Sequence, residues 1–475
     1  MSSPDRIEKE QQREHRLRIR LEENRKDEEV YVDPNEDIYD VPKFQGCFTK
    51  SLIHDPDGIP DQKETEKMLH GINRCWCSLD QISYPGSLRL MNPSAVHSYD
   101  IVGPFKACTY IPPVPRLGSP ETAVEMIELY NMALMRDIPF KSYSTSQQAM
   151  LACTDLGTTP ETLFRTELTG HYVSQFLLLP YSHGCVDVEQ KLRCYPPGVD
   201  FMKTWDLALS CQNGSVQELL PDRTIRRHII NLRDGVTYVH LDDSIQSGLA
   251  VACILDRLKC PGPKGIVKET RFLDLGRLDL LDIITAATRA AMMTAWYHKW
   301  SICRIRPECV GMYVHRAIID GVNPGIHKSL LESPVLNRVY SKFGCYLLPQ
   351  AYPEGSPAHP AYPAGHAVSI GVMTTILKAF YDEDFLIDGF ETSDDGSQLL
   401  PLGQKFRVGD ELNKLASNIS NFRNAAGVHY RSDSHGIEMG ERIAINVLKD
   451  YVRRYCHNVT FSFHKRNGRL VIISN

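Results

Sequence analysis

Residues 278–300 constrain the fold most, because they form the longest apolar stretch with helical spacing in the chain. Apolar residues from Leu280 to Ala295 recur every three or four positions, so a helix would place them on one buried face. Lys299 is next on that face, where a lysine must snorkel, lose its charge or meet an anion. Arg306 follows seven residues later, and Pro307 ends or kinks the helix. The stretch predicts a mainly α protein with cations at its core, unless both basic residues face water at a helix end.

A second stretch, residues 354–366, reads EGSPAHPAYPAGH and is predicted to be a loop that becomes a helix at His366. Its prolines forbid regular helix, whereas the residues after His366 are apolar at helical spacing. Backbone amides at such a helix start form an anion site, and Gly365 lets an anion approach the backbone closely. Taken alone the pattern is weak, since a histidine at a helix start is more often structural than catalytic.

A third stretch begins at Asp410, which is predicted to cap a helix whose apolar face ends beside Arg423. Gly427 then permits a break. His429 and Asp433, four residues apart, are predicted to share one face of the next helix and to hydrogen-bond. The carboxylate would fix the tautomer of the imidazole. The alternative is an ordinary solvated pair.

The remaining chain predicts further helices and little strand. Helix starts are expected at residues 119–121 and 159–161, each a cap, a proline and an acidic residue, and helix is expected again near Ser244. Residues 236–241 suggest a short strand, and residues 459–473 a hairpin around Asn467-Gly468. Residues 30–117 predict long irregular segments.

Composition excludes several classes of protein. The chain has 475 residues, 42% of them hydrophobic, which is enough for a sizeable core. The formal net charge of -5 mixes both signs, so we expect no nucleic-acid partner. We expect no membrane span and no export signal, hence a cytoplasmic protein by default. The 14 cysteines show no C-x-x-C pair and are expected to be reduced and mostly buried. We expect a charged arm over residues 1–29 and one helical domain over residues 30–475.

The three stretches together predict one pocket for a tetrahedral oxyanion, since stacked cations without an anion would be costly. Arginine suits phosphate or vanadate oxygens through paired N–H donors, and lysine adds a point charge. The residues concerned are Lys299 and Arg306, Gly365 and His366, and Arg423 and His429.

These residues also carry a resemblance. Read in order they give K-x6-R-P, P-A-G-H and R-x5-H-x3-D. This series resembles the three-part signature of the vanadium-dependent haloperoxidases, which belong with the type-2 phosphatidic-acid and bacterial acid phosphatases. The signature region spans residues 275–454, and its surroundings are similar to the bromoperoxidase branch of red algae and bacteria. The resemblance implies two helical bundles with the active site in one of them, and a homo-oligomer.

The resemblance implies a vanadate cofactor with His429 as the single protein ligand of vanadium. Lys299, Arg306, Arg423 and the Gly365 amide would neutralise the vanadate oxygens. Ala364 stands where the family has a serine, so one contact to vanadate would be missing, which keeps open a vanadium-free relative that retains the fold.

The same resemblance implies oxidation of bromide or iodide by hydrogen peroxide to hypohalous acid, which halogenates an organic acceptor. His366 would act as acid and base, Lys299 would polarise the peroxide, and Asp433 would orient the imidazole of His429. His359 would favour bromide and iodide over chloride, although a simple loop histidine is the alternative. The other candidate reaction is hydrolysis of a phosphate ester, with His429 as nucleophile and His366 as acid.

Overall fold

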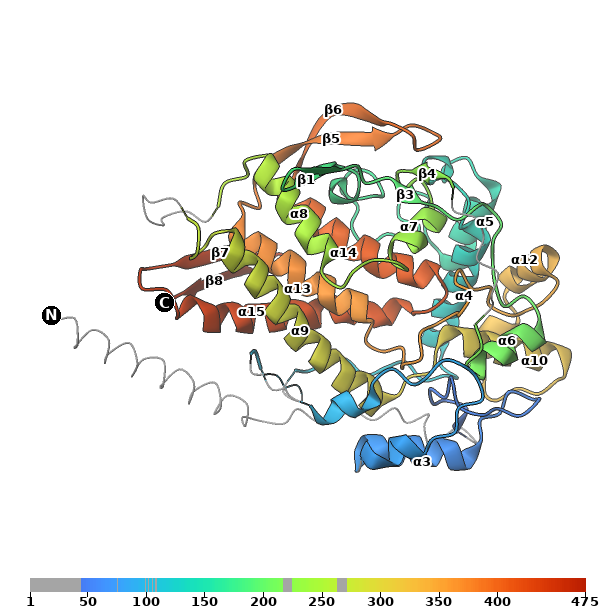
Figure 1. Ribbon diagram of the computed structural model, residues 1–475. Helices are drawn as coiled ribbons and strands as arrows, with labels where there is room; N and C mark the ends of the chain where they lie inside the picture. The colour runs from blue at the N-terminus through green and yellow to red at the C-terminus, as the bar shows by residue number, and fades with distance from the viewer. Residues whose placement is uncertain are drawn as a thin grey trace.

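Helices make up most of the regular secondary structure in the computed structural model, and the strands form only short two-stranded sheets (Figure 1). The structure describes residues 44–74, 76–98, 100, 102–104, 106, 109–216, 224–262 and 271–475. The predicted arm of residues 1–29 lies outside them. Within these ranges, no helix is long and apolar enough to cross a bilayer.

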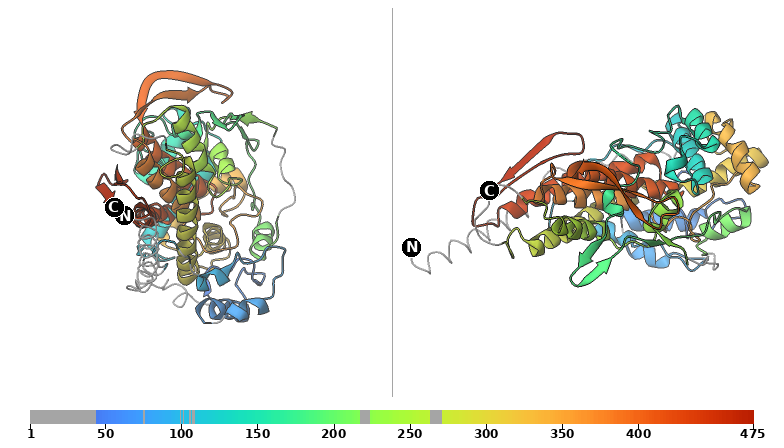
Figure 2. Two further views of the ribbon diagram at one scale, coloured as in Figure 1. Left: turned by 60° about the vertical axis from the view of Figure 1, so that its left-hand side comes forward. Right: turned by 90° about the horizontal axis from the view of Figure 1, so that it is seen from above.

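Helix α13 (Gly365–Phe380) lies at the centre of one helical group. It packs against α9 (Arg277–Ile302), α14 (Val408–Ala425) and α15 (Gly436–Val452), and Figure 1 and Figure 2 show these helices running beside one another. Its apolar residues are buried on every side, so it forms the core of this group. α13 and α15 approach so closely that a Cβ atom on Gly371 would lie 2.3 Å from a carbonyl oxygen of α15.

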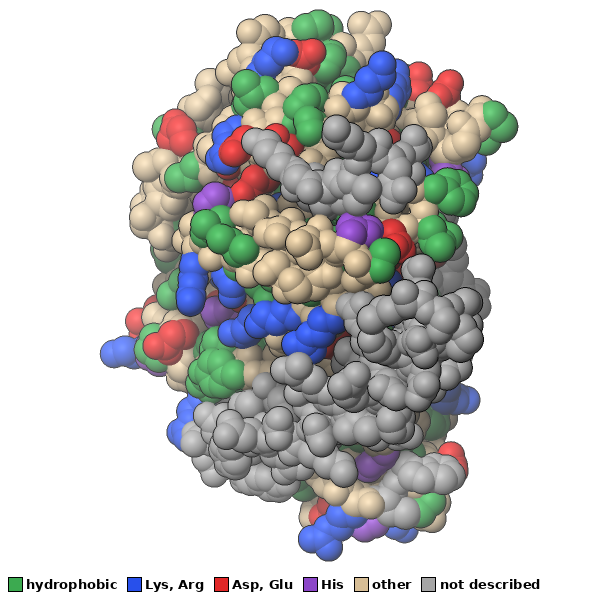
Figure 3. All heavy atoms as spheres, turned by 90° about the vertical axis from the view of Figure 1, so that its left-hand side faces the viewer, with side chains coloured by type: hydrophobic (Ala, Val, Ile, Leu, Met, Phe, Trp, Pro, Cys, Tyr) green, Lys and Arg blue, Asp and Glu red, His purple; other side chains and the backbone are tan. Residues whose placement is uncertain are grey.

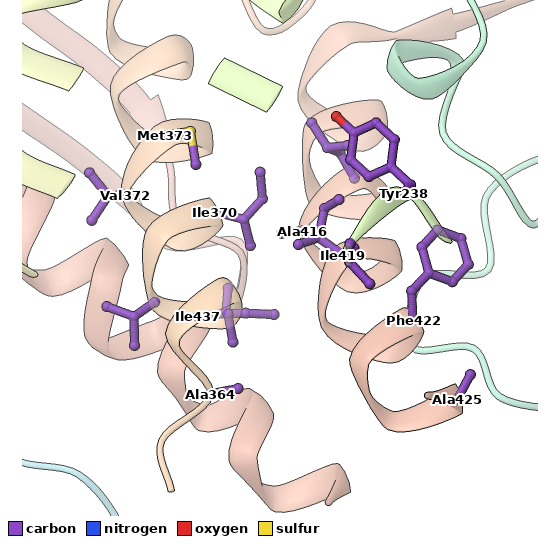
Figure 4. Packing of buried hydrophobic residues seen from close by; sticks show 14 of the residues in the cluster. Tyr238, Ala364, Ile370, Val372, Met373, Ala416, Ile419, Phe422, Ala425 and Ile437 are labelled. Carbon is purple, nitrogen blue, oxygen red and sulfur yellow. The ribbon is translucent and has the colours of Figure 1, made fainter. Parts of the chain in front are cut away.

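The facing surfaces of α13 and α14 also form part of a cavity wall. Figure 4 shows Ile370 and Met373 of α13 opposite Ala416 and Ile419 of α14. All four side chains are buried. Ile370, Met373 and Ile419 also line the cavity described below, so the same packing fixes one of its walls.

A second helical group surrounds α4 (Pro120–Met135), which contacts α5 (Gln147–Leu156), α11 (Lys328–Leu331) and α12 (Pro334–Phe343). The side chain of Ser119 accepts a hydrogen bond from the third residue of α4, as the cap predicted. α4 also contacts α14, which joins the two groups. The prediction of a mainly α fold is confirmed.

The other helices and the strands cover these groups. The remaining α-helices are α3 (Gln62–Asn73), α6 (Trp205–Gln212), α7 (Leu232–Tyr238), α8 (Gln246–Arg257) and α10 (Pro307–Ile319). Short 3-10 helices are η2 (Trp76–Gln81), η3 (Pro93–His97), η5 (Phe140–Ser142), η6 (Gln175–Leu177) and η7 (Arg431–His435). Antiparallel pairs join β1 (Tyr181–His183) to β2 (Val186–Val188), β3 (Leu192–Arg193) to β4 (Arg226–Arg227), β5 (Leu386–Thr392) to β6 (Leu399–Arg407), and β7 (Thr460–His464) to β8 (Leu470–Ser474).

Several predicted elements are confirmed. The longest apolar stretch is α9, the helix expected near Ser244 is α8, and the Asn467-Gly468 hairpin is β7 with β8. Acidic and basic side chains are interspersed over the described part of the face shown in Figure 3. Residues 30–117 are less irregular than expected where they are described, because they include α3.

Two predicted elements are wrong. Residues 159–165 form turns instead of a helix, and Phe164 adopts a left-handed φ of 59° that places its ring in the core. Asn421 and Tyr172 bind its carbonyl oxygen there, and these contacts outweigh the local helix signal. Residues 236–238 belong to helix α7 instead of a strand, because Asn231 caps this helix and Gly235 lies against the ring of Phe422.

Two further predictions need correction: the start of helix α14 and the redox state of the cysteines. α14 begins at Val408, so Asp410 lies inside its first turn and does not cap it. The prediction that the cysteines are reduced is wrong for Cys77, which is disulfide-bonded. The free thiols in the described ranges are buried apart from Cys185 and Cys456.

Candidate active site

His429 lies in the loop between α14 and η7, and its ring is held by a buried carboxylate. Nδ1 of His429 is 2.6 Å from Oδ2 of Asp433, and the two side chains are 1% and 0% exposed. This excludes the alternative of a solvated pair. The predicted contact is therefore present, although the helix expected to carry both residues begins only at Arg431. The carboxylate keeps the proton on Nδ1 and leaves the lone pair on Nε2.

Asp433 is itself fixed by neighbouring donors. Arg304 donates to its Oδ1 over 2.8 Å, and the amide of Tyr430 donates to its Oδ2 over 3.1 Å. Arg304 also pairs with Glu125 of α4 at 2.9 Å. Asp433 contacts His429 and does not line the cavity, so it is a positioning residue.

Arg306, the residue before α10, faces the free nitrogen of His429. Its Nη1 lies 3.1 Å from Nε2 of that ring and donates to the carbonyl of Val428 over 2.6 Å. Its Nε donates to the carbonyl of His359 over 2.9 Å, and its Nη2 lies 3.0 Å from Nδ1 of the same residue. Arg306, from the first predicted stretch, thus contacts both His359 of the second stretch and His429 of the third.

Lys299 and Arg423 are the other two predicted cations, and both point inward from the last turns of their helices. Lys299 of α9 is 0% exposed, and its Nζ donates to the carbonyls of Pro360 and Ala361 over 2.9 and 3.0 Å. Nη1 of Arg423 donates to the carbonyl of Val239 over 2.8 Å. Its Nε is buried and has no partner among the described residues.

These three cations lack a counter-ion of their own. Unlike Arg304, neither Lys299 nor Arg306 nor Arg423 forms a salt bridge with a carboxylate of the described chain. Burial, together with the charge of Arg306, lowers the pKa of Lys299 well below its usual value. Burial also lowers the pKa of Arg306 to about 9. Uncompensated buried cations around an imidazole lone pair fit a tetrahedral oxyanion bound at that nitrogen.

The start of α13 adds uncharged donors. Ala364 is the N-cap residue, is 1% exposed and offers no side-chain cap. The first amides of α13, on Gly365 and His366, have no carbonyl partner within the helix and carry the positive end of its dipole. A Cβ atom on Gly365 would lie 3.2 Å from Met292, so the wall is close on this side.

His366 faces the cavity and has a carboxylate partner. Its Nε2 lies 3.0 Å from Oδ1 of Asp242, and its side chain is 29% exposed. Burial and the charge of Arg423 lower the pKa of His366, while Asp242 opposes that shift. His366 is therefore neutral near pH 7 and can accept a proton, after which Asp242 stabilises the imidazolium.

The cavity has a volume of about 280 Å³ and receives side chains from all three predicted stretches. His359 is part of its wall, and its ring lies 4.9 Å from that of Trp296. The polar lining residues are His240, Asp242, Asp243, Ser244, Ser247, Trp296, Tyr352, Glu354, His359, His366, Ser369, Arg423 and His429. Of the predicted site residues, Lys299, Arg306, Ala364 and Asp433 do not line it. His298 and Arg431 do not line it either, and Arg431 pairs with Glu128.

Four groups at this site were not predicted from the sequence: Asp242, the pair of His240 with Glu354, Trp296, and Arg304. Nε2 of His240 is 2.6 Å from Oε1 of Glu354. Trp296 lies three residues before Lys299 on the same helix, and that spacing could have identified it. Asp242 comes from a turn-rich stretch with no motif, so no local signal marks it.

The chain is similar to known proteins in both sequence and fold. Residues 280–458 match the sequence family described as the VCPO second helical-bundle domain. The chain is 33% identical to a vanadium-dependent bromoperoxidase of Ascophyllum nodosum over 81% of this chain and 77% of that protein. It is 28% identical to a vanadium-dependent bromoperoxidase of Corallina officinalis over 94% of each. Its fold matches the homohexameric second vanadate-dependent bromoperoxidase of Ascophyllum nodosum with a TM-score of 0.92 and 26% identity, over 100% of this chain and 91% of that one.

Proposed function

The chain belongs to the vanadium-dependent haloperoxidases, and on that ground we propose that it oxidises bromide or iodide with hydrogen peroxide to hypohalous acid, which halogenates organic acceptors. The choice of bromide as a substrate is supported by the bromoperoxidase names of its relatives. A TM-score of 0.92 to a homohexameric protein supports a homo-oligomer.

One observation carries the proposal: three buried cations, none with a carboxylate partner in the described chain, act on His429, and one of them, Arg306, lies 3.1 Å from its Nε2. Vanadate would be held at Nε2 of His429, with Lys299, Arg306 and Arg423 neutralising its oxygens and the Gly365 amide donating to it. When bound, vanadate supplies a Lewis acid that activates peroxide toward a halide. Because burial and the neighbouring cations lower the pKa of His429, its ring stays neutral and its lone pair remains available.

The protein side chains would then manage protons and halide access. His366 accepts a proton from hydrogen peroxide, and Asp242, 3.0 Å from its Nε2, stabilises the charged ring. His359 and Trp296 form a wall of the cavity, and Nδ1 of His359 is engaged with Arg306 at 3.0 Å. We place the halide approach on this side.

A titration of the purified, vanadate-free protein with orthovanadate tests the proposal. Bromination of a dye should depend on vanadate and should be suppressed by phosphate, because both tetrahedral anions need the same cations. His429→Ala should retain no vanadium by elemental analysis, whereas His228→Ala, at a histidine that is also buried but lies outside the cavity, should retain it. Hydrolysis of an aryl phosphate without dye bromination would instead support the phosphohydrolase alternative.

A further inference from the structure

The carboxylate of Glu308 is buried in the first turn of α10, beside the cavity but outside it. Its Oε1 accepts hydrogen bonds from Nζ of Lys50 at 2.7 Å, from Nε2 of Gln212 at 2.9 Å and from Oγ of Ser356 at 2.7 Å. Its Oε2 accepts from the amide of Ser356 at 2.7 Å. The side chains of Lys50 and Glu308 are 1% and 3% exposed, so this is a desolvated ion pair with its acceptors satisfied.

The loop before His359 is folded around this ion pair. Gly355 has a φ of 65°, and a Cβ atom there would lie 2.3 Å from Oε2 of Glu308, so only glycine permits the close approach. Lys50 donates a second hydrogen bond over 2.6 Å to the carbonyl of Glu354. Two side chains that do not line the cavity therefore hold residues 354–356. Lys50 binds the carbonyl of Glu354, and Glu308 binds the amide and the hydroxyl of Ser356.

The same turn of α10 also holds the far end of the loop. Arg306, two residues before Glu308, binds both the carbonyl and Nδ1 of His359, at 2.9 and 3.0 Å. The side chains of Glu354 and His359, one on each side of the anchored segment, both line the cavity. The position of His359 relative to Lys299 and Arg423 thus depends on the hydrogen bonds from Ser356 to Glu308 as well as on the contacts of Arg306 with His359.

We propose that Lys50 and Glu308 are positioning residues for halide oxidation, acting through the loop that carries His359. The proposal rests on the proposed function, since it concerns the step in which a halide is oxidised. Side chains that line a reaction cavity must be held within about 0.5 Å, and a displacement of about 1 Å can reduce the rate by about a hundredfold. Lys50 lies far from the signature residues in sequence, in a region where sequence analysis placed no chemistry.

The test is the double variant Lys50→Met/Glu308→Gln. Removing both charges together leaves no unpaired buried ion. The glutamine oxygen can still accept from the hydroxyl of Ser356, whereas the amide of Ser356 loses the second carboxylate oxygen as its acceptor. We expect the KM for bromide to rise about tenfold. His359→Ala, which removes the cavity-lining ring itself, should raise this KM as well. The half-saturating vanadate concentration should change less than about twofold, because Ala361, which binds Lys299, is held separately by the carbonyl of Arg304 at 3.0 Å.

A second readout does not depend on activity. In the vanadate-free protein, the amides of residues 354–361 should exchange hydrogen faster in the double variant than in the parent, because the amide of Ser356 and its neighbours lose their anchor. If the double variant fails to fold, Ser356→Ala removes a single hydrogen bond from the loop side, and should change both readouts in the same direction by a smaller amount.

The matched control is Lys414→Met/Glu411→Gln, which removes another buried ion pair, 2.6 Å long with side chains 1% and 0% exposed, on α14. It should lower stability while leaving the KM for bromide and the exchange of residues 354–361 unchanged. Equal behaviour of the two double variants, or an unchanged KM and exchange rate in Lys50→Met/Glu308→Gln, overturns the proposal. Failure of the proposed function looks different, since the parent protein would then oxidise no bromide at any vanadate concentration.

Discussion

Three of the four histidines that line the cavity differ in their partners, and each partner determines what the ring can do. Nδ1 of His429 faces a carboxylate at 2.6 Å, which leaves Nε2 free to bind a metal. Nδ1 of His359 faces a guanidinium donor of Arg306 at 3.0 Å and must accept that hydrogen bond. His366 has Asp242 at 3.0 Å and can be charged in turn, which suits an acid and base.

The role of Asp433 can be separated from that of Asp242 by matched substitutions. Asp433→Asn removes the carboxylate that orients the ligand ring, so we expect vanadate affinity to fall by roughly 10- to 100-fold. Asp242→Asn acts on the ring that moves protons, so kcat should fall while the half-saturating vanadate concentration stays the same. Titration of both variants with orthovanadate, read by bromide oxidation, checks this. Weaker vanadate binding in Asp242→Asn alone would reverse the two roles.

Ala364 provides a test by gain of a contact. A serine there would place a hydroxyl at the start of α13 beside the free amides, and hydrogen bonds to charged groups contribute roughly 1.5–3 kcal/mol. Ala364→Ser should therefore tighten vanadate by about ten- to a hundredfold, as measured by isothermal titration. Ala379→Ser adds the same hydroxyl at the far end of the helix and should have no effect on vanadate. Unchanged or weaker binding in Ala364→Ser would show that the pocket is shaped around alanine, and would favour a vanadium-free relative.

At the scale of elements, sequence patterns predicted the helices that carry the site but not the segments between them. α9 and α13 have long apolar stripes whose burial outweighs local alternatives, so their spacing was sufficient. The turn at residues 159–165 and helix α7 depend on contacts with α14, which no local pattern contains. His429 lies outside any helix for the same reason, because its loop is held by Arg306 and Arg304.

The turn that presents His429 depends on Gly427, which supports a test at this scale. Gly427 has a φ of 86°, and a Cβ atom there would lie 2.7 Å from Nε2 of Gln350. Gly344, at the end of α12, has a φ of 74° with nothing within 4 Å. Both substitutions to alanine incur the left-handed strain, roughly 1–2 kcal/mol, but only Gly427→Ala adds crowding beside the ligand. Urea unfolding should show the larger loss for Gly427→Ala, and only that variant should bind vanadate more weakly. Equal losses would mean that Gln350 moves aside freely.

At the scale of the whole molecule, the site joins segments that are distant in sequence. The residues of the three motifs were identified from the sequence because each lies at a rim of an apolar helix. Glu125, Asp242 and Lys50 pair with Arg304, His366 and the carbonyl of Glu354, and all three come from the chain before α9, where no repeat or motif marks them. Charge complementarity between distant segments becomes visible only in the folded chain. The chain before α9 therefore contributes counter-charges and an anchor to a site whose cations come from α9 and the chain after it.

This arrangement predicts how the stability of the vanadate-free protein depends on pH. Burial and nearby cations lower the pKa values of His429, His359 and His366 below the value of about 6.5 expected in the unfolded chain. Below pH 6.5 the unfolded state therefore binds more protons than the folded state, so the free energy of unfolding falls as the pH falls. Each ring that stays neutral contributes up to about 1.4 kcal/mol per pH unit.

Phosphate can be used to identify how much of this pH dependence of stability comes from the cavity. Titratable groups outside the cavity should contribute the same pH dependence whether or not phosphate is present. A bound oxyanion neutralises Lys299, Arg306 and Arg423, and raises the pKa values that these cations depress. Urea unfolding between pH 5 and 8, with and without phosphate, should therefore show stabilisation by phosphate that grows as the pH falls below about 6.5. Lys299→Met should reduce that gain. A phosphate effect that is absent, or identical at pH 5 and pH 8, would mean that the buried cations do not share one anion site with the histidines.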